Sequence, residues 1–249
     1  MALQVHEDSE FVSSRLSQPC AVPHLGEGVY TVPDAVRILQ LPLPFLQRWI
    51  SGYSRILTDG DHKHSRGIVD QGCWGAGRHR GINFFALIEV YTFAALRRLG
   101  VSAQKIRKAR DELAERFGTV YPFASHSLLS DGKQVLVVLA GVEEPVLMIL
   151  GERGQTALRK VIEPFCRKID FCESTSLAER FWPLGRERAV IVDPRRGFGR
   201  PTLFGTNITT ETIAQFVVAG ESEDSVAHEF EVSKQAVLDA VEFEFRKAA

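Results

Sequence analysis

Two short helical patterns of apolar residues lie near the start of the chain, separated by a proline-containing break. Residues 35–39 place their apolar side chains on one helical face, and residues 45–50 do so again. The segment 41–44, Leu-Pro-Leu-Pro, interrupts the periodicity. Two short helices joined by a tight break predict a helix-turn-helix, with Gln47 and Arg48 projecting from the second helix. The alternative is a two-helix hairpin with a purely structural role.

The segment that follows, residues 53–81, is polar, basic and rich in glycine. Frequent glycines favour hairpins and turns, and a β-wing of this kind lays arginines along a phosphate backbone. Its histidines and Cys73 match no standard zinc spacing, so we expect no metal and no other cofactor. The residues predicted to contact DNA are Gln47, Arg48, Arg55, Arg66, Arg78 and Arg80.

A long apolar stripe over residues 84–99 predicts a helix that ends at Gly100. A second helix is expected to begin after Ser102, a good N-cap residue, and to bury apolar residues as far as Phe117. Its outer face is basic over residues 105–110. Such a face is either simply solvated or close enough to DNA to contact phosphates.

Residues 121–184 change to β-rich runs at 127–129, 135–139 and 146–150, followed by a helical pattern over 155–167. The aromatic residues near 171 and 181 suggest further strands. We interpret this region as a small α+β module. It serves either dimerisation or partner binding, or it is structural only.

The last region opens with a strand over 189–192 and a turn at Asp193, which we interpret as a turn-capping residue. A basic loop over 195–200 follows. Three helices are then predicted, and the spacing of their small and apolar residues is typical of a second helix-turn-helix, with His228 on its surface. The expected N-caps are Thr209 or Thr210, Ser222 and Ser233.

Composition adds limits to this picture. The chain has 249 residues, of which 45% are hydrophobic and 24% charged, as in an ordinary globular protein. Its start is acidic and its longest apolar run, 135–142, is too short to span a bilayer, so we expect a cytoplasmic protein without a membrane segment. The four cysteines form no CxxC pair and are expected to be reduced. No GxSxG, HExxH, P-loop or GxGxxG motif occurs, so we do not expect an enzyme.

The predicted fold class is α+β and mainly α. We expect a flexible tail over residues 1–29, a winged helix-turn-helix domain over 30–118, a central α+β module over 119–186, and a C-terminal helix-turn-helix bundle over 187–249.

Charge is distributed unevenly among these regions. Residues 30–117 contain 14 Lys and Arg against 8 Asp and Glu, a net charge of +6 in a chain whose total is −1. Residues 205–249 contain 3 basic and 9 acidic residues, a net charge of −6. Because DNA affinity depends on cations placed at phosphates, the first segment suits DNA and the second does not. We therefore hypothesise that the C-terminal helix-turn-helix contacts protein, either a second copy of itself or the toxin of a toxin–antitoxin pair.

The N-terminal third resembles the MerR family of winged helix-turn-helix regulators. This resemblance implies that the second helix and the wing read DNA, although the loop over 52–81 is longer than the usual wing. The matching segments are 30–35, 46–49, 84–99, 99–102 and 105–107.

The last 60 residues or so resemble the antitoxins of VapBC-type toxin–antitoxin systems. The matching segments are 192–194, 199–201, 205–209, 219–220 and 222–237. The resemblance implies an antitoxin that blocks a PIN-like ribonuclease toxin and represses a shared operon by binding operator DNA. We also expect a homodimer. The basic loop would touch phosphate or the acidic centre of the toxin. The alternative function is a stand-alone MerR-like transcription regulator whose central module senses a ligand or dimerises. The residues predicted to contact toxin or protein are Arg195, Arg196, Phe198, Arg200, Lys234 and Gln235.

Overall fold

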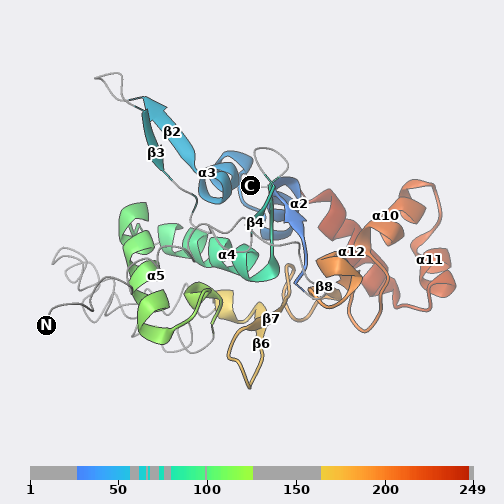
Figure 1. Ribbon diagram of the computed structural model, residues 1–249. Coiled ribbons are helices and arrows are strands. Elements are labelled where there is room, and N and C mark those ends of the chain that lie inside the picture. Colours follow the sequence, from blue (N-terminus) through green and yellow to red (C-terminus); the bar gives the residue numbers. More distant parts are fainter. Residues whose placement is uncertain are drawn as a thin grey trace, which may run out of the picture.

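The computed structural model describes residues 27–56, 62–65, 67, 73–75, 80–98, 100–125 and 164–246. Helices dominate these residues, and the strands form small antiparallel sheets (Figure 1). The fold is therefore α+β and mainly α, as predicted. Within the described ranges, no helix is both long enough and apolar enough to cross a bilayer.

The N-terminal region begins with β1 (Tyr30–Thr31) and the two short helices α2 (Val32–Leu39) and α3 (Leu43–Ser51). Thr31 starts α2 through a capping box, in which its side chain accepts a hydrogen bond from Asp34 N while the Asp34 carboxylate accepts one from Thr31 N. Each helix has a proline in its first turn, where the fixed φ of proline suits a helix and its missing N–H group costs no hydrogen bond within the helix. The predicted pair of helices is thus present.

Strands and two longer helices complete this region. The hairpin β2 (Tyr53–Ile56) and β3 (His62–Ser65) is antiparallel, and β5 (Gly81–Ile82) pairs with both β1 and β4 (Cys73–Trp74). The helices α4 (Phe84–Arg98) and α5 (Ala103–Phe117) follow, then the 3-10 turn η3 (Pro122–Ala124). Ser102 caps α5 by accepting a hydrogen bond from Lys105 N, as the sequence predicts.

A four-stranded antiparallel sheet forms the middle of the described C-terminal part. Its strands are β6 (Ile169–Phe171), β7 (Ala178–Phe181), β8 (Val190–Val192) and β9 (Pro201–Leu203), in that order. Phe181 of β7 pairs with Val192 of β8, so the sheet crosses the expected module boundary between residues 186 and 187. The strands predicted over 127–129, 135–139 and 146–150, and most of the helix predicted over 155–167, lie outside the described residues.

Three helices end the chain: α10 (Thr210–Val218), α11 (Glu223–Glu229) and α12 (Lys234–Phe245). Their N-caps are Thr209, Ser222 and Ser233, each of which accepts a hydrogen bond from the backbone N–H three residues on. A small core of Leu203, Ile213, Val226, Ala236, Val237 and Ala240 lies beneath them.

The main hydrophobic core is continuous from the first helices to the last. It joins Leu46, Phe93 and Phe123 of the N-terminal region to Phe181 of the sheet and Phe243 of α12. Polar contacts reinforce this junction. Arg246 donates to the backbone oxygens of Arg37 and Ile38 at the end of α2, and its guanidinium lies 4.4 Å from the centroid of the Phe243 ring. The C-terminal helix is therefore fixed to the back of the N-terminal helix-turn-helix.

Candidate nucleic-acid interface

The helix α3 is held from behind by aromatic packing. Leu46, Trp49 and Ile50 are buried, and the Trp49 ring lies 4.4 Å from the Phe93 ring of α4. On α5, the Arg107 guanidinium lies 5.0 Å from the centroid of the Trp49 ring, which is cation–π geometry. These contacts fix the rotation of α3 about its axis.

The opposite face of α3 carries the two residues predicted to read DNA. Gln47 and Arg48 are both exposed there. An exposed amide and guanidinium on the second helix of a helix-turn-helix can reach base edges or phosphates.

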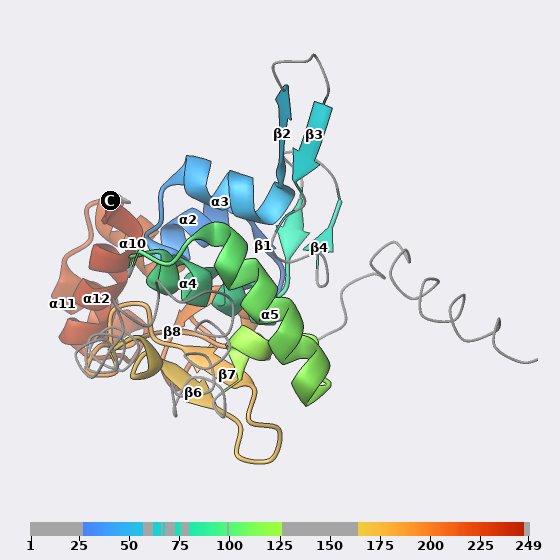
Figure 2. The ribbon, with the colours of Figure 1, turned by 90° about the vertical axis from the view of Figure 1, so that its left-hand side faces the viewer.

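The hairpin β2–β3 projects from the body of the molecule beside α3 (Figures 1 and 2). Its register is regular from the pair Tyr53 and Ser65 to the pair Ile56 and His62. After the hairpin, the chain returns very close to the end of α3. A Cβ atom on Gly67 would lie 2.5 Å from the backbone oxygen of Ile50, so only glycine fits at this point. The hairpin has the position of a wing relative to α3.

The remaining predicted DNA contacts are only partly described. Arg55 belongs to the projecting strand β2, whereas Arg66 and Arg78 lie outside the described residues. Arg80 is half-buried just before β5, and among the described residues its Nε atom has no hydrogen-bond partner. The structure brings Gln47 and Arg48 together on one helix and puts Arg55 on the neighbouring wing.

Two arginines that contribute to the positive net charge of residues 30–117 form ion pairs within the protein. Arg37 pairs with Glu244 of α12 at 2.7 Å, and Arg110 pairs with the buried Glu89 at 2.8 Å. The Glu89 carboxylate also accepts a hydrogen bond from Phe123 N, which ties α4 to η3. Burial raises the pKa of Glu89 to about 7, although the Arg110 cation opposes this shift. The available positive charge of the N-terminal region is therefore smaller than the count of basic residues suggests.

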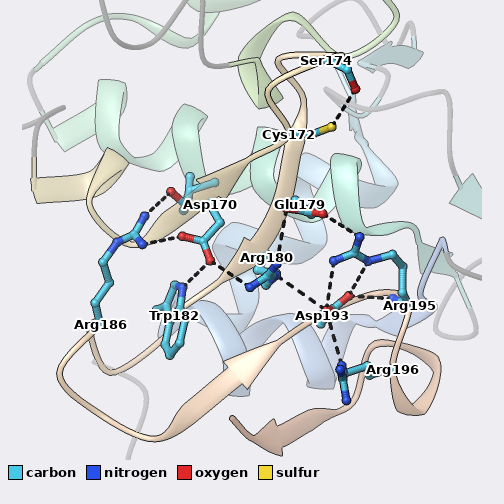
Figure 3. Close-up of polar contacts among 11 residues, drawn as sticks. Asp170, Cys172, Ser174, Glu179, Arg180, Trp182, Arg186, Asp193, Arg195 and Arg196 are labelled. Atoms are coloured by element: carbon cyan, nitrogen blue, oxygen red, sulfur yellow. Dashed lines mark hydrogen bonds and ion pairs between the residues drawn. The ribbon is translucent and has the colours of Figure 1, made fainter. Parts of the chain in front are cut away.

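In the basic loop predicted to contact the toxin, Arg195 and Arg196 form ion pairs with carboxylates of this same chain (Figure 3). Arg195 contacts Glu179 at 2.6 Å and Asp193 at 3.2 Å, while Arg196 approaches Asp193 at 3.9 Å. Asp193 also accepts a hydrogen bond from Arg195 N, the turn-capping role expected from the sequence. Phe198 is 72% exposed and Arg200 is exposed, so these two side chains present the outer part of the loop.

Residues at the start of α12 are engaged in the same way. Lys234 forms an ion pair with Asp224 at 2.7 Å, and the Gln235 amide donates to Asp239 at 2.8 Å. Asp239 is buried and also accepts from Ala189 N and Arg188. Lys234 and Gln235, both predicted to contact toxin or protein, are therefore each bound within their own module.

Two family models match this chain. Residues 28–110 match the family described as "Putative DNA-binding HTH domain", and this range covers α2, α3, the hairpin, α4 and the first part of α5 as far as Arg110. Residues 190–243 match the family described as "Protein of unknown function (DUF433)". The segment of the first match contains both α3 and the β2–β3 hairpin.

Most of the chain resembles an antitoxin. It is 27% identical over 222 residues to the "Putative antitoxin VapB45" of Mycobacterium tuberculosis, covering 86% of this chain and 92% of that protein. The resemblance to VapB-type antitoxins predicted from the sequence is therefore confirmed. The chain is also 26% identical over 235 residues to the "Uncharacterized protein Rv2308" of the same organism, covering 88% of this chain and 91% of that protein.

The fold itself has a counterpart among solved structures. The crystal structure of Rv2018 from Mycobacterium tuberculosis aligns with a TM-score of 0.65 and 24% sequence identity, over 90% of this chain and all of that one. This similarity supports the overall arrangement of helices and sheets.

Proposed function

We propose that this protein is an antitoxin that binds operator DNA through α3 and the β2–β3 hairpin and neutralises a PIN-like ribonuclease toxin through its C-terminal part. DNA binding is supported above all by Gln47 and Arg48, which are both exposed on α3. They lie beside a projecting hairpin, in a segment with a net charge of +6. The similarity to a protein named as an antitoxin supports the other part of the proposal. The protein acts as a cytoplasmic homodimer and has no catalytic activity of its own.

Within this proposal, the two ends of the chain have separate tasks. Arg48, Arg55, Arg66, Arg78 and Arg80 supply the cations that displace counterions from DNA. The acidic C-terminal helices repel the phosphate backbone and engage protein, and Phe198 and Arg200 of the basic loop contribute to that contact. Autoregulation follows when the same molecule holds both the toxin and its operator.

Charge reversal separates the two tasks. The double variant Arg48→Glu and Arg78→Glu is expected to weaken operator binding by more than about a hundredfold, because each lost phosphate or base contact is worth roughly 1–3 kcal/mol. Inhibition of the toxin should be unchanged. The control variant Lys234→Glu should leave operator binding intact, and an equal loss in that control would contradict the assignment of the two ends.

Co-purification tests the antitoxin half directly. When the chain is expressed together with the reading frame adjacent to its gene, we expect a small ribonuclease to purify with it in an inhibited state. If the adjacent product never associates with the chain while operator binding persists, a stand-alone MerR-like regulator is the correct description.

A further inference from the structure

The α10–α11 end of the molecule combines exposed aromatic and aliphatic side chains with uncompensated negative charge. Residues 205–233 contain six Asp and Glu and no Lys or Arg. Phe216 is 41% exposed and Val218 is 69% exposed, both at the end of α10. We name this surface the acidic-apolar ridge, formed by Phe216, Val218, Glu221, Glu229, Phe230 and Glu231.

The two aromatic side chains of the ridge are in contact. The rings of Phe216 and Phe230 meet edge to face, with centroids 5.1 Å apart, and thus connect the end of α10 to the end of α11. The core beneath these helices consists of Leu203, Ile213, Val226, Ala236, Val237 and Ala240, and Phe230 is partly buried against it. Phe216 and Val218 lie outside this core. Exposed apolar side chains that gather outside a core are typical of a binding site.

Carboxylates adjoin these side chains in the sequence, since Glu221 follows Val218 by three residues and Glu229 and Glu231 flank Phe230. Glu221, Glu229 and Glu231 are all exposed. Lys234, the nearest cation in the sequence, is paired with Asp224. Interfaces use apolar anchors for affinity and complementary charges at the rim for specificity and rate.

We propose that the acidic-apolar ridge is the docking surface for a segment of the toxin that presents two or three apolar side chains flanked by Lys or Arg. This inference rests on the proposed antitoxin function and names the surface that the function uses. DNA is disfavoured here because the ridge repels phosphates. A second copy of the chain is disfavoured because symmetric pairing would place like carboxylates against each other.

The ridge lies away from the proposed DNA-binding surface. The α10–α11 end and the β2–β3 hairpin lie well apart in both views, at the right and upper left in Figure 1 and at the left and top in Figure 2. A partner on the ridge therefore leaves α3 and the hairpin open, so one antitoxin molecule can hold the toxin and operator DNA together.

Two independent variants test the ridge in the full-length chain. We expect Phe216→Ser with Val218→Ser to weaken binding of the co-expressed ribonuclease by about tenfold or more, as anchor residues do. Glu229→Lys with Glu231→Lys should have a similar effect through the rim charges and leaves the apolar side chains intact. Toxin affinity is measured by titration calorimetry, and operator affinity should stay at the wild-type value in both variants.

Matched controls lie on α5. Phe117 is 41% exposed, the same fraction as Phe216, and Phe117→Ser should not change toxin affinity. Glu112→Lys with Glu115→Lys, also exposed, repeats the charge change away from the ridge. Thermal unfolding followed by circular dichroism verifies that each variant is folded.

The outcomes distinguish the two proposals. Wild-type chain that fails to bind the ribonuclease contradicts the proposed function. If the wild-type chain binds the ribonuclease and both folded ridge variants bind it with the same affinity, the ridge is not the docking surface, and the proposed antitoxin function stands. Loss of self-association instead of toxin binding, seen by sedimentation, would assign the ridge to a second copy and also overturn this inference.

Discussion

Glu89 shows how one buried side chain links the helices behind the candidate interface. Its carboxylate accepts hydrogen bonds from Arg110 and from Phe123 N, and its side chain has no exposed surface. Desolvation disfavours the charged form, and the surrounding donors only partly compensate. The group therefore holds its proton more tightly in the folded protein than in the unfolded chain.

The pH dependence of stability follows from this shift. The pKa of Glu89 is raised from 4.5 to about 7 in the folded protein. The contribution of Glu89 to the free energy of unfolding is fully present below the pKa of this group in the unfolded chain. It is lost as the pH rises through about 7, and the loss is on the order of 3 kcal/mol. Urea unfolding of wild type and Glu89→Gln over this pH range should show a smaller decrease for the variant, which cannot titrate. Parallel profiles for the two proteins would contradict this account of Glu89.

At the scale of elements, the placement of the wing depends on one close backbone approach. Gly67 follows the hairpin and passes the end of α3 so closely that a Cβ would meet the backbone oxygens of Ile50 and Trp49 at 2.5 and 3.0 Å. Neither oxygen can move without shifting α3 itself. The relative position of hairpin and helix is thus set by a residue that need not touch DNA.

The substitution Gly67→Ala should therefore displace the hairpin from α3 and weaken operator binding about tenfold, with a loss of about 1–3 kcal/mol of stability. The control is Gly81→Ala, where the nearest atom to a new Cβ is a Val29 methyl at 3.4 Å. Fluorescence anisotropy with labelled operator DNA measures both variants. Equal affinity for the two would show that the close approach does not position the wing.

Local chemistry made several elements predictable from the sequence. Ser102, Ser222 and Ser233 cap the helices expected after them, because an N-cap needs only a short polar side chain and the three residues that follow. The two short helices on either side of the Leu-Pro-Leu-Pro segment were predictable because their signals are also local. Exposure of Gln47 and Arg48 followed from the apolar positions around them.

Contacts between distant segments were not predictable in this way. The pairing of β7 with β8 crosses the expected module boundary, since short strands carry little information about their neighbours. The ion pair of Arg37 with Glu244 joins residues 207 positions apart. A charge count along the sequence cannot reveal that such an arginine is already neutralised.

At the scale of the whole molecule, α12 and the N-terminal helix-turn-helix share one core. Phe243 is fully buried in it, and Arg246 bridges α12 to the end of α2. Burial lowers the pKa of Arg246 to about 10, still high enough for the side chain to remain charged at neutral pH. The helix α12 and the N-terminal helix-turn-helix therefore belong to a single folded unit.

Phe243→Ala is expected to cost about 3–5 kcal/mol and to destabilise α2 together with α12. Hydrogen exchange should show faster exchange at amides of both helices. The control is Phe245→Ala in the same helix, where the ring is 58% exposed and its loss should have little effect. Faster exchange confined to α12 would show that the two ends unfold separately.

We expect the cations of α3 and the β2–β3 hairpin, and not those of the C-terminal helices, to contact DNA. The salt dependence of operator binding measures this directly, because each phosphate contact adds about 0.9 to the slope of log affinity against log salt concentration. We expect Arg48→Ala to reduce the slope by about one contact, and Lys234→Ala to leave it at the wild-type value. An unchanged slope for Arg48→Ala together with a reduced slope for Lys234→Ala would contradict the account.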